Sequence, residues 1–437
     1  MAVMANLDEL SDAWRTLSAW LVPLNEDALF WWQATGPPLA LMLLEAGYDI
    51  HTQYESLLFH YRFVVSQLGP RPSADGQLRS WKSYVTDDFT PLEFSWNWDN
   101  PASGLPPKVR CTMEAIGPKT GTQKDRFNQV ATLKLVSQLQ MAFPNTDWQW
   151  FHHFAKAFHD SGNGQGSIGN YEGLNNDPSS ILLGFELRKG GVDIKAYFSP
   201  VKSIQTGCSR LDILTQGVES LERNESRQPE SITFPAYHTL VNFLTTTPEG
   251  STLGITGVGI DCVEASKSRL KVYVRSSHTS LNTIRTIMTL GDKQSSFQKE
   301  GAIQQLQELC KLVLGLTNDF SPNKQLPSKN GKCADIVYNF DIKNGDRTPE
   351  PQVYIPVQCY GQDDLSIAQG LGEFMKSQGR SAYVDRYINM VQKICCYRSL
   401  SSGCGLQTYI SCGIKNGLLS ITSYISPEMY HRGRWSK

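Results

Sequence analysis

Several motifs that would assign the chain to a common enzyme class are missing from its 437 residues. The ten cysteines form no C-x-x-C pair, and the adjacent Cys395-Cys396 does not have the spacing of a zinc site. Neither a P-loop nor a strand-linked G-x-G-x-x-G occurs. There is no D-D-x-x-D or N-D-x-x-D, since Asp87-Asp88 and Asp363-Asp364 both lack the third carboxylate. The sequence therefore does not predict a diphosphate site bridged by metal ions.

The chain also lacks a surplus of charge and long hydrophobic runs. Lys and Arg number 41 against 42 Asp and Glu, and a net charge of -1 argues against broad binding to nucleic acid or anionic membranes. No stretch approaches the ~18 apolar residues of a membrane span, and no basic segment with an apolar run opens the chain. Scattered cysteines indicate reduced thiols. We expect a cytoplasmic protein with no nucleic-acid or membrane partner, in which any anion site is a local cluster.

Hydrophobic periodicity predicts the same arrangement five times, namely two helices followed by two strands. Short turns such as Lys189-Gly190-Gly191 are typical of antiparallel hairpins. No residues match at a fixed period, so the predicted repeat is structural only. The expected strands cover residues 91–98, 108–116, 181–188, 192–199, 253–262, 268–276, 334–342, 351–358, 405–414 and 417–425. The expected helices cover residues 26–46, 50–67, 124–141, 146–160, 203–222, 234–246, 280–290, 298–315, 363–378 and 382–397.

Five hairpins make ten strands, each with one apolar and one polar face. A closed antiparallel barrel ringed by about ten helices covers every apolar face, turns the polar faces inward and leaves no unpaired edge. We therefore predict an α+β fold with a solvated lumen. We expect a single domain over residues 1–437, with the barrel unit at 26–425, an N-terminal extension at 1–25 and a C-terminal tail at 426–437.

The polar faces of these strands carry cations. In the strand near 268–276, Arg269, Lys271, Tyr273 and Arg275 share one side, opposite the apolar residues between them. Unpaired cations in a partly dry chamber are costly, so we expect an anion such as a diphosphate beside them. Exposure to solvent, or ion pairs with Glu114 and Glu186, would be the alternative. The cations predicted to line the lumen are Arg110, Lys195, Arg269 and Lys271.

Tyrosines and one carboxylate fall on the same faces. A phenol can donate to a phosphate oxygen and can shield a carbocation with its ring, although tyrosines also favour strands in general. Glu93 could accept a hydrogen bond from an aromatic N–H, or it could form a salt bridge to a lumen cation. We interpret His152, His153 and His159 as solvent or core residues and not as metal ligands. The tyrosines predicted to face the lumen are Tyr197, Tyr273, Tyr354, Tyr409 and Tyr424.

With these residues the chain resembles the fungal aromatic prenyltransferases of the dimethylallyltryptophan synthase family, the ABBA (PT) barrel enzymes. The resemblance runs from about Trp31 to Tyr424. Its most specific segments are Pro91-Leu92-Glu93-Phe94-Ser95, Lys195-Ala196-Tyr197-Phe198, Ser268-Arg269-Leu270-Lys271-Val272-Tyr273, Gln352-Val353-Tyr354 and Thr408-Tyr409.

The resemblance implies transfer of a dimethylallyl group from dimethylallyl diphosphate to an indole, with no metal or other cofactor required. It implies that Glu93 binds the indole N–H. The implied diphosphate ligands are Arg110, Lys195, Arg269, Lys271 and Gln352, and the implied shield of the allyl cation is Tyr197, Tyr273, Tyr354, Tyr409 and Tyr424.

The chain departs from the family pattern at three places. No Lys or Arg occurs between Arg227 and Lys267, although members that prenylate free tryptophan have an arginine there, at a place near Thr256 in this sequence. Residues 180–183 replace a lysine base of some members, and Ser420 replaces a tyrosine of many. These departures favour a larger indole acceptor without a free carboxylate, such as an indole diterpenoid or a tryptophan-containing cyclic dipeptide.

Two alternatives remain open at this point. The acceptor could be a non-indole aromatic such as tyrosine, a xanthone or another phenol. The barrel could also bind isoprenoid diphosphates without catalysis. The sequence leaves open whether the protein is a monomer or a homodimer.

Overall fold

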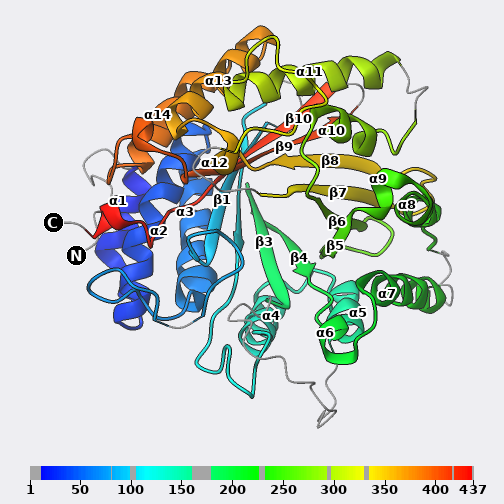
Figure 1. Cartoon of the computed structure of the whole chain (residues 1–437). Coiled ribbons are helices and arrows are strands. Elements are labelled where there is room, and N and C mark those ends of the chain that lie inside the picture. The colour runs from blue at the N-terminus through cyan, green and yellow to red at the C-terminus, as the bar shows by residue number, and fades with distance from the viewer. Residues whose placement is uncertain are drawn as a thin grey trace.

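The computed structural model describes residues 11–79, 81–98, 105–159, 179–225, 232–292, 297–328, 334–415 and 418–435. These residues form ten strands and fourteen α-helices (Figure 1). The strands are β1 (Leu92–Trp98), β2 (Lys108–Met113), β3 (Ile181–Arg188), β4 (Gly191–Phe198), β5 (Gly254–Asp261), β6 (Arg269–Ser276), β7 (Ile336–Lys343), β8 (Glu350–Ile355), β9 (Gln407–Lys415) and β10 (Leu418–Ile425).

Two helices precede each hairpin at the predicted places, and four further helices of four to nine residues add to them. The helices are α1 (Asp12–Trp20), α2 (Glu26–Glu45), α3 (Ile50–Phe59), α4 (Val130–Ala142), α5 (Gln149–Phe158), α6 (Lys202–Thr206), α7 (Arg210–Glu225), α8 (Pro235–Thr246), α9 (Pro248–Ser251), α10 (Leu281–Met288), α11 (Phe297–Leu314), α12 (Val357–Tyr360), α13 (Asp364–Ser377) and α14 (Val384–Ile394). Helical structure continues beyond α3 through a π-helical turn (His60–Val64) and a 3-10 turn (Val65–Gln67). No described helix has both the length and the hydropathy that a membrane crossing requires.

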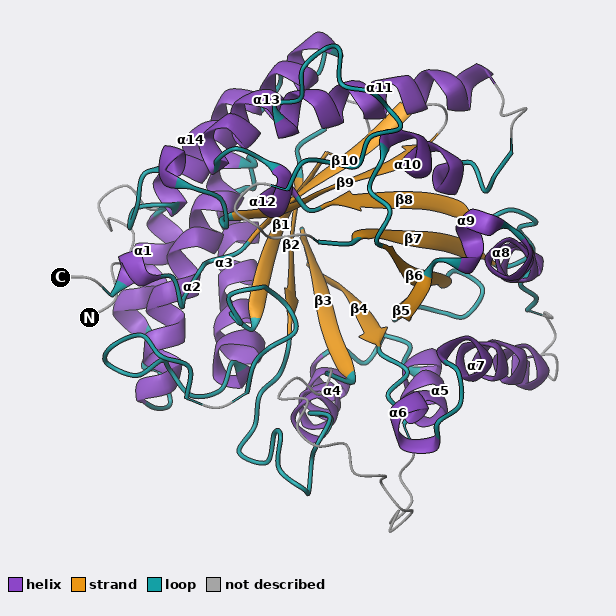
Figure 2. Ribbon diagram, in the orientation of Figure 1, coloured by secondary structure: helices purple, strands orange, loops and turns teal. Residues whose placement is uncertain are grey.

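The ten strands form one closed antiparallel barrel. Each strand pairs with its neighbours in sequence, and pairing of β1 with β10, where Phe94 lies opposite Ile425, closes the ring. Figure 2 shows the strands at the centre and the helices around them. The predicted α+β barrel is therefore confirmed, and closure removes the exposed edges that an open sheet would present.

Apolar side chains that point outward from the barrel pack against the helices. The ring of Phe185 on β3 lies 4.9 Å from that of Phe59 on α3, and the ring of Phe198 on β4 lies 5.4 Å from that of Phe151 on α5. Full burial of such a side chain stabilises a fold by about 1.5–3 kcal/mol. The hydrophobic core is therefore the layer between barrel and helices, and the lumen is left to polar residues.

One predicted strand end was wrong, and one helix continues through two prolines. The helix α2 runs through Pro37 and Pro38, and its middle is buried by its neighbours. The strand expected to reach residue 358 ends at Ile355, since Pro356 has no N–H for a ladder hydrogen bond. Gln358 consequently lies in α12 and not on a strand.

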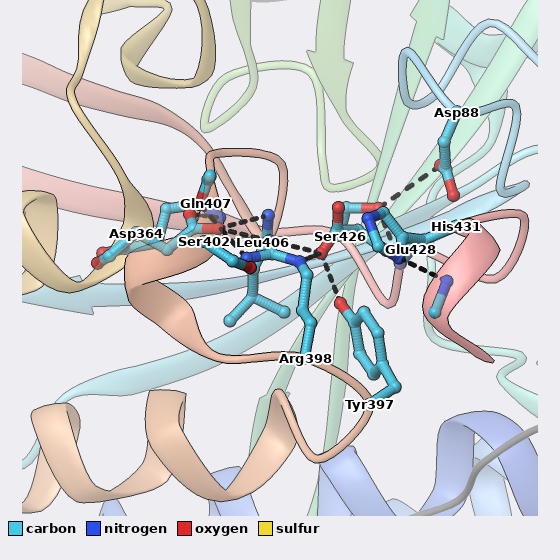
Figure 3. Close-up of polar contacts among 12 residues, drawn as sticks. Asp88, Asp364, Tyr397, Arg398, Ser402, Leu406, Gln407, Ser426, Glu428 and His431 are labelled. Atoms are coloured by element: carbon cyan, nitrogen blue, oxygen red, sulfur yellow. Dashed lines mark hydrogen bonds and ion pairs between the residues drawn. The ribbon is translucent and has the colours of Figure 1, made fainter. Parts of the chain in front are cut away.

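A buried ion cluster holds the chain after β10 against the barrel, and Figure 3 shows its contacts. We call this group, formed by Arg398, Asp364, Glu428 and Tyr397, the Arg398 cluster. The Nη2 of Arg398 lies 2.5 Å from Oδ2 of Asp364 and 2.7 Å from Oε2 of Glu428. The hydroxyl of Tyr397 donates a hydrogen bond to Glu428. The side chains of Arg398, Asp364 and Glu428 are at most 7% exposed, so this polar group is internal.

Candidate functional site

The barrel lumen contains three adjoining spaces that share lining residues. We call them the mouth cavity (about 840 Å³), the middle chamber (about 230 Å³) and the floor pocket (about 50 Å³). Glu93 and Arg275 line both the mouth cavity and the middle chamber. Tyr197 and Tyr273 line both the middle chamber and the floor pocket. The three spaces therefore form one sequence along the lumen.

Cations gather at the floor pocket. Arg110 from β2, Lys195 from β4 and Lys271 from β6 line it. The Nζ of Lys195 lies 3.0 Å, and the Nε of Arg110 2.6 Å, from the same oxygen, Oε2 of Glu186. Lys108 lies 3.1 Å from the other oxygen of this carboxylate. Glu186 therefore forms ion pairs with these cations, which was the alternative to an anionic ligand. This one carboxylate is, however, shared by three cations.

The next layer of the barrel holds Arg269 between two carboxylates. Its Nε lies 2.8 Å from Oδ2 of Asp261, and its Nη1 lies 2.6 Å from Oδ2 of Asp341. Lys271 has no carboxylate within 4 Å among the described residues, and these two aspartates act on it only at longer range. Counted over the described chain, these layers contain five cations and three carboxylates: Lys108, Arg110, Lys195, Arg269 and Lys271 against Glu186, Asp261 and Asp341.

This surplus of positive charge shifts the pKa values of the residues around the floor pocket. Burial, together with the charges of Arg110 and Lys271, lowers the pKa of Lys195 to about 8. Burial also lowers the pKa of Lys271. Burial acts to raise the pKa of Glu186, but its cation partners outweigh burial and hold this pKa below its usual range. A multiply charged anion would raise the pKa values of Lys195 and Lys271 again, because it stabilises the charged ammonium groups.

Four tyrosines form a continuous layer above the floor pocket. Ring centroids are 6.0 Å apart for Tyr197 and Tyr273, 6.2 Å for Tyr273 and Tyr354, and 5.7 Å for Tyr354 and Tyr424. Burial raises the pKa of all four hydroxyls, so they stay protonated and can donate hydrogen bonds. The layer can therefore offer π-faces to a cation above and donors to an anion below.

Small residues on the neighbouring strands make room for this layer. A Cβ atom at Gly184 or at Gly259 would lie 2.9 Å from the ring of Tyr197. Gly184 and Gly259 are on β3 and β5, the two strands that flank Tyr197 on β4. Glycine at both positions therefore leaves the space that the Tyr197 ring occupies.

The two remaining predicted ligands occupy different heights in the lumen. Gln352 lines the floor pocket, and its Nε2 donates to Oγ of Ser411 at 2.8 Å. Tyr409 lies apart from the four-tyrosine layer and lines the mouth cavity. The structure therefore brings together all of the predicted cations and four of the five predicted tyrosines, and it places the fifth nearer the entrance.

Glu93 stands at the junction of the mouth cavity and the middle chamber. Its Oε1 accepts a hydrogen bond from Oγ1 of Thr408 at 2.6 Å. Burial raises the pKa of Glu93 to about 8, and the negative charge of Asp87 acts in the same direction. A group with this pKa exchanges its proton near neutrality, as expected of a residue that accepts a proton or hydrogen bond from a substrate.

A loop that we did not predict from the sequence to belong to the site forms one wall of the mouth cavity. Residues 82–87 line the cavity, and Glu114, 0% exposed, anchors this loop. Its carboxylate accepts hydrogen bonds from Nε1 of Trp81 at 2.6 Å, Oγ of Ser83 at 2.8 Å and the backbone N–H of Tyr84 at 3.0 Å. Glu114 therefore positions the mouth and does not neutralise the lumen cations, contrary to one alternative above.

Within the described part of the chain, no group of three or more His, Cys, Asp or Glu side chains is arranged to hold a metal ion. His152 contacts Gln140 at 2.9 Å, and His153 contacts the carbonyl oxygen of Gly217 at 2.8 Å. His159 lies near the ring of Phe127.

Comparison with known proteins agrees with this geometry. The family model described as tryptophan dimethylallyltransferase matches residues 27–390. Prenyltransferase GME11375 of Pestalotiopsis microspora is 36% identical over 98% of this chain and 94% of its own length. Xanthone prenyltransferase A of Emericella nidulans is 33% identical over 92% of this chain and 93% of its own. The 4-O-dimethylallyl-L-tyrosine synthase of Claviceps purpurea is 31% identical over 92% of this chain and 89% of its own.

Solved structures share the fold. AnaPT from Neosartorya fischeri superposes with a TM-score of 0.80 at 25% identity, covering 97% of this chain and 99% of that one. NotF in complex with brevianamide F and DMSPP superposes with a TM-score of 0.78 at 22% identity, covering 95% of this chain and 98% of that one.

Proposed function

The chain belongs to the tryptophan dimethylallyltransferase family of aromatic prenyltransferases, and from this premise we propose that it transfers a dimethylallyl group from dimethylallyl diphosphate to a hydroxylated aromatic acceptor. The observation that carries the proposal is the order of groups along one lumen. Cations lie at the floor, a tyrosine layer lies above them, and a proton-accepting carboxylate lies at the junction with a large cavity.

In the proposed reaction the diphosphate binds at the floor pocket. Lys195, Lys271 and Arg110 supply charge there, Gln352 and the tyrosine hydroxyls supply donors, and Arg269 supports them from the next layer. As the allylic C–O bond breaks, negative charge grows on the leaving group, and these fixed donors stabilise it most at that moment. They take the part that magnesium would otherwise play, so we expect turnover in the presence of EDTA.

The allyl cation then lies against the tyrosine layer, shielded from water. An aromatic carbon of the acceptor attacks it, and the ring then gives up a proton to the released diphosphate and regains its aromaticity. Glu93, whose pKa of about 8 leaves a part of it ionised near neutral pH, accepts in that form a hydrogen bond from the acceptor hydroxyl and raises the electron density of the ring. Tyr409 and the loop at residues 82–87 line the cavity in which the rest of the acceptor would lie.

Relatives above 30% identity favour the phenolic acceptor, because two of them are named for a xanthone and for tyrosine. An indole-containing acceptor is the second candidate, and the position of Glu93 favours it, since the same carboxylate could accept an indole N–H. The two candidates differ in whether a hydroxyl or an indole N–H donates the hydrogen bond to Glu93. They do not differ in the chemistry of the prenyl donor.

Incubation with dimethylallyl diphosphate and EDTA, with acceptors analysed by mass spectrometry, tests the proposal. The panel contains a hydroxyxanthone, tyrosine, tryptophan and a tryptophan-containing cyclic dipeptide. We expect prenylated phenols, and we expect Glu93→Gln to lower kcat/KM for the acceptor about 10²–10⁴-fold with donor Kd nearly unchanged. Preference for the indoles would favour the second candidate. Saturable donor binding without diphosphate release for any acceptor would indicate a non-catalytic barrel.

A further inference from the structure

Arg275 is a cation on the acceptor side of the tyrosine layer, away from the floor pocket. It lies on β6 with Arg269, Lys271 and Tyr273, and these alternate residues face the lumen. Arg275 lines the mouth cavity and the middle chamber, whereas the floor pocket is lined by Lys271 and Tyr273 from this strand. One strand therefore supplies cations on both sides of the tyrosine layer, and those below it are already explained by the diphosphate.

The protein itself does not balance this charge at close range. Over the described residues, Arg275 has no carboxylate within 4 Å, and its buried Nε has no hydrogen-bond partner. The guanidinium carbon lies 5.9 Å from the centre of the Tyr84 ring. Arg269, on the same strand, has two aspartates. Three carboxylates line the same mouth cavity, but none of them lies within 4 Å of Arg275, namely Asp87, Glu93 and Asp335. A guanidinium that is partly removed from water and has no close carboxylate favours an anionic ligand.

Arg275 also faces Glu93 across the lumen. In the closed ring of ten strands, β1 and β6 stand five places apart, so these two side chains come from opposite walls. Both line the mouth cavity and the middle chamber. An acceptor that lies between them meets a hydrogen-bond acceptor at one end and a fixed cation at the other, because a guanidinium does not lose its proton in proteins.

We propose that Arg275 determines acceptor specificity by binding a carboxylate of the aromatic substrate, opposite the end that Glu93 receives. The acceptor class is then a hydroxylated aromatic acid. This inference rests on the proposed function and narrows its substrate. The planar guanidinium suits a carboxylate because two parallel N–H donors match its two oxygens.

The test compares acids with their neutral esters in binding, so it does not depend on turnover. The probes are 6-hydroxy-2-naphthoate and 4-hydroxybenzoate, each against its methyl ester, titrated by calorimetry. We expect wild type to bind at least one acid about tenfold or more tightly than its ester. Arg275→Met should abolish this preference and leave ester affinity within about threefold, and Arg275→Lys should keep part of it. Lys376→Met removes a cation that is 51% exposed and lines none of the three lumen spaces, and it should change nothing.

Three results would overturn the inference: equal affinity of wild type for acid and ester, an acid preference that survives in Arg275→Met, or no binding of any acid. A loss of affinity for dimethylallyl diphosphate in Arg275→Met, as large as in Lys271→Met, would instead assign Arg275 to the donor. Acid preference without transfer of a prenyl group would refute the proposed function and leave only the binding of a carboxylate by Arg275 established.

Discussion

Two groups of mostly buried charged residues in this protein differ in which charge is in excess and in how their hydrogen bonds are completed. In the Arg398 cluster, one guanidinium meets two carboxylates, and the hydroxyl of Tyr397 and two backbone N–H groups of residues 406 and 407 complete their hydrogen bonds. At the floor pocket and the layer beside it, five cations meet three carboxylates among the described residues. The first group is satisfied internally, and the second is not.

The pKa shifts of the cations differ between the two groups. Burial alone would lower the pKa of Arg398, but Glu428 and Asp364 raise it, so the charged form is favoured. The excess of carboxylate in this cluster appears at Glu428, whose pKa is raised by burial. For Lys195 and Lys271, burial lowers the pKa and the nearby carboxylates do not restore it. A buried ion group whose hydrogen bonds are completed by its own members and the backbone therefore indicates a role in folding, whereas a surplus of buried cations beside a cavity indicates a ligand of opposite charge.

The largest effect that distinguishes the two groups is expected for a substitution of Arg398. Arg398→Met leaves the carboxylates of Asp364 and Glu428 buried without their cation, so we expect a loss of about 3–5 kcal/mol in the free energy of unfolding. Urea denaturation measures this loss. Donor affinity of the folded fraction should stay close to that of wild type, because the cluster lies outside the floor pocket.

A matched control for this substitution is Lys376→Met. Lys376 pairs with Asp385 at 3.0 Å, but its side chain is 51% exposed. Loss of such a surface pair should cost less than about 1 kcal/mol. If Arg398→Met costs no more than this control, the structural role of the cluster is refuted.

The second prediction is a loss of activity without a loss of stability, which is the opposite of the first. Lys271→Met should lower kcat/KM for dimethylallyl diphosphate about 10²–10³-fold, as expected when one preorganised donor to a developing charge is removed. Stability should stay the same or rise, because the substitution removes a buried cation without a close carboxylate. Steady-state kinetics and urea denaturation on one preparation measure both effects. A large loss of stability with little loss of rate would show that Lys271 is structural.

Much of the barrel could be predicted from the sequence because its determinants are local. Alternation of period two along β6 separates Lys271 and Tyr273 from the buried Leu270 and Val272, and the same alternation recurs in the other strands. Short turns fix each hairpin, and ten polar faces then have only one interior to share. The convergence of Arg110, Lys195 and Lys271 on one pocket follows from this pattern.

Features that depend on contacts between distant segments could not be predicted. Glu114 carries no signal that it anchors the loop at Trp81 and Tyr84, because those hydrogen bonds form only after β2 and the loop have met. The pair of Asp364 with Arg398 joins positions 34 residues apart by a contact without sequence periodicity. Charge compensation is likewise a property of the folded lumen, and the sequence alone could not decide it.

The lack of a cation near Thr256 shows this limit most clearly. Taken along the chain, it argued against an acceptor with a free carboxylate. In the barrel, however, β5 and β6 are neighbours, and Arg275 on β6 lines the same middle chamber as Thr256 on β5. A neighbouring strand can therefore supply the cation that β5 lacks.

The smallest predicted effect refines the comparison through pH. Because the pKa of Lys195 is lowered to about 8 in the protein alone, this ammonium loses its proton as pH rises through 8, whereas a bound diphosphate would raise that pKa and keep the proton. Donor binding should therefore take up a proton above pH 8, and donor Kd should rise about tenfold between pH 7 and pH 9. Calorimetry with dimethylallyl diphosphate in buffers of different ionisation enthalpy measures both quantities.

Two variants serve as controls for this prediction. Lys195→Met should flatten the rise in donor Kd. Lys108→Met removes a cation whose side chain is 43% exposed, and it should retain the rise. A donor Kd that stays constant from pH 7 to pH 9 in wild type would show that the surplus charge at the floor pocket is not held ready for an anion.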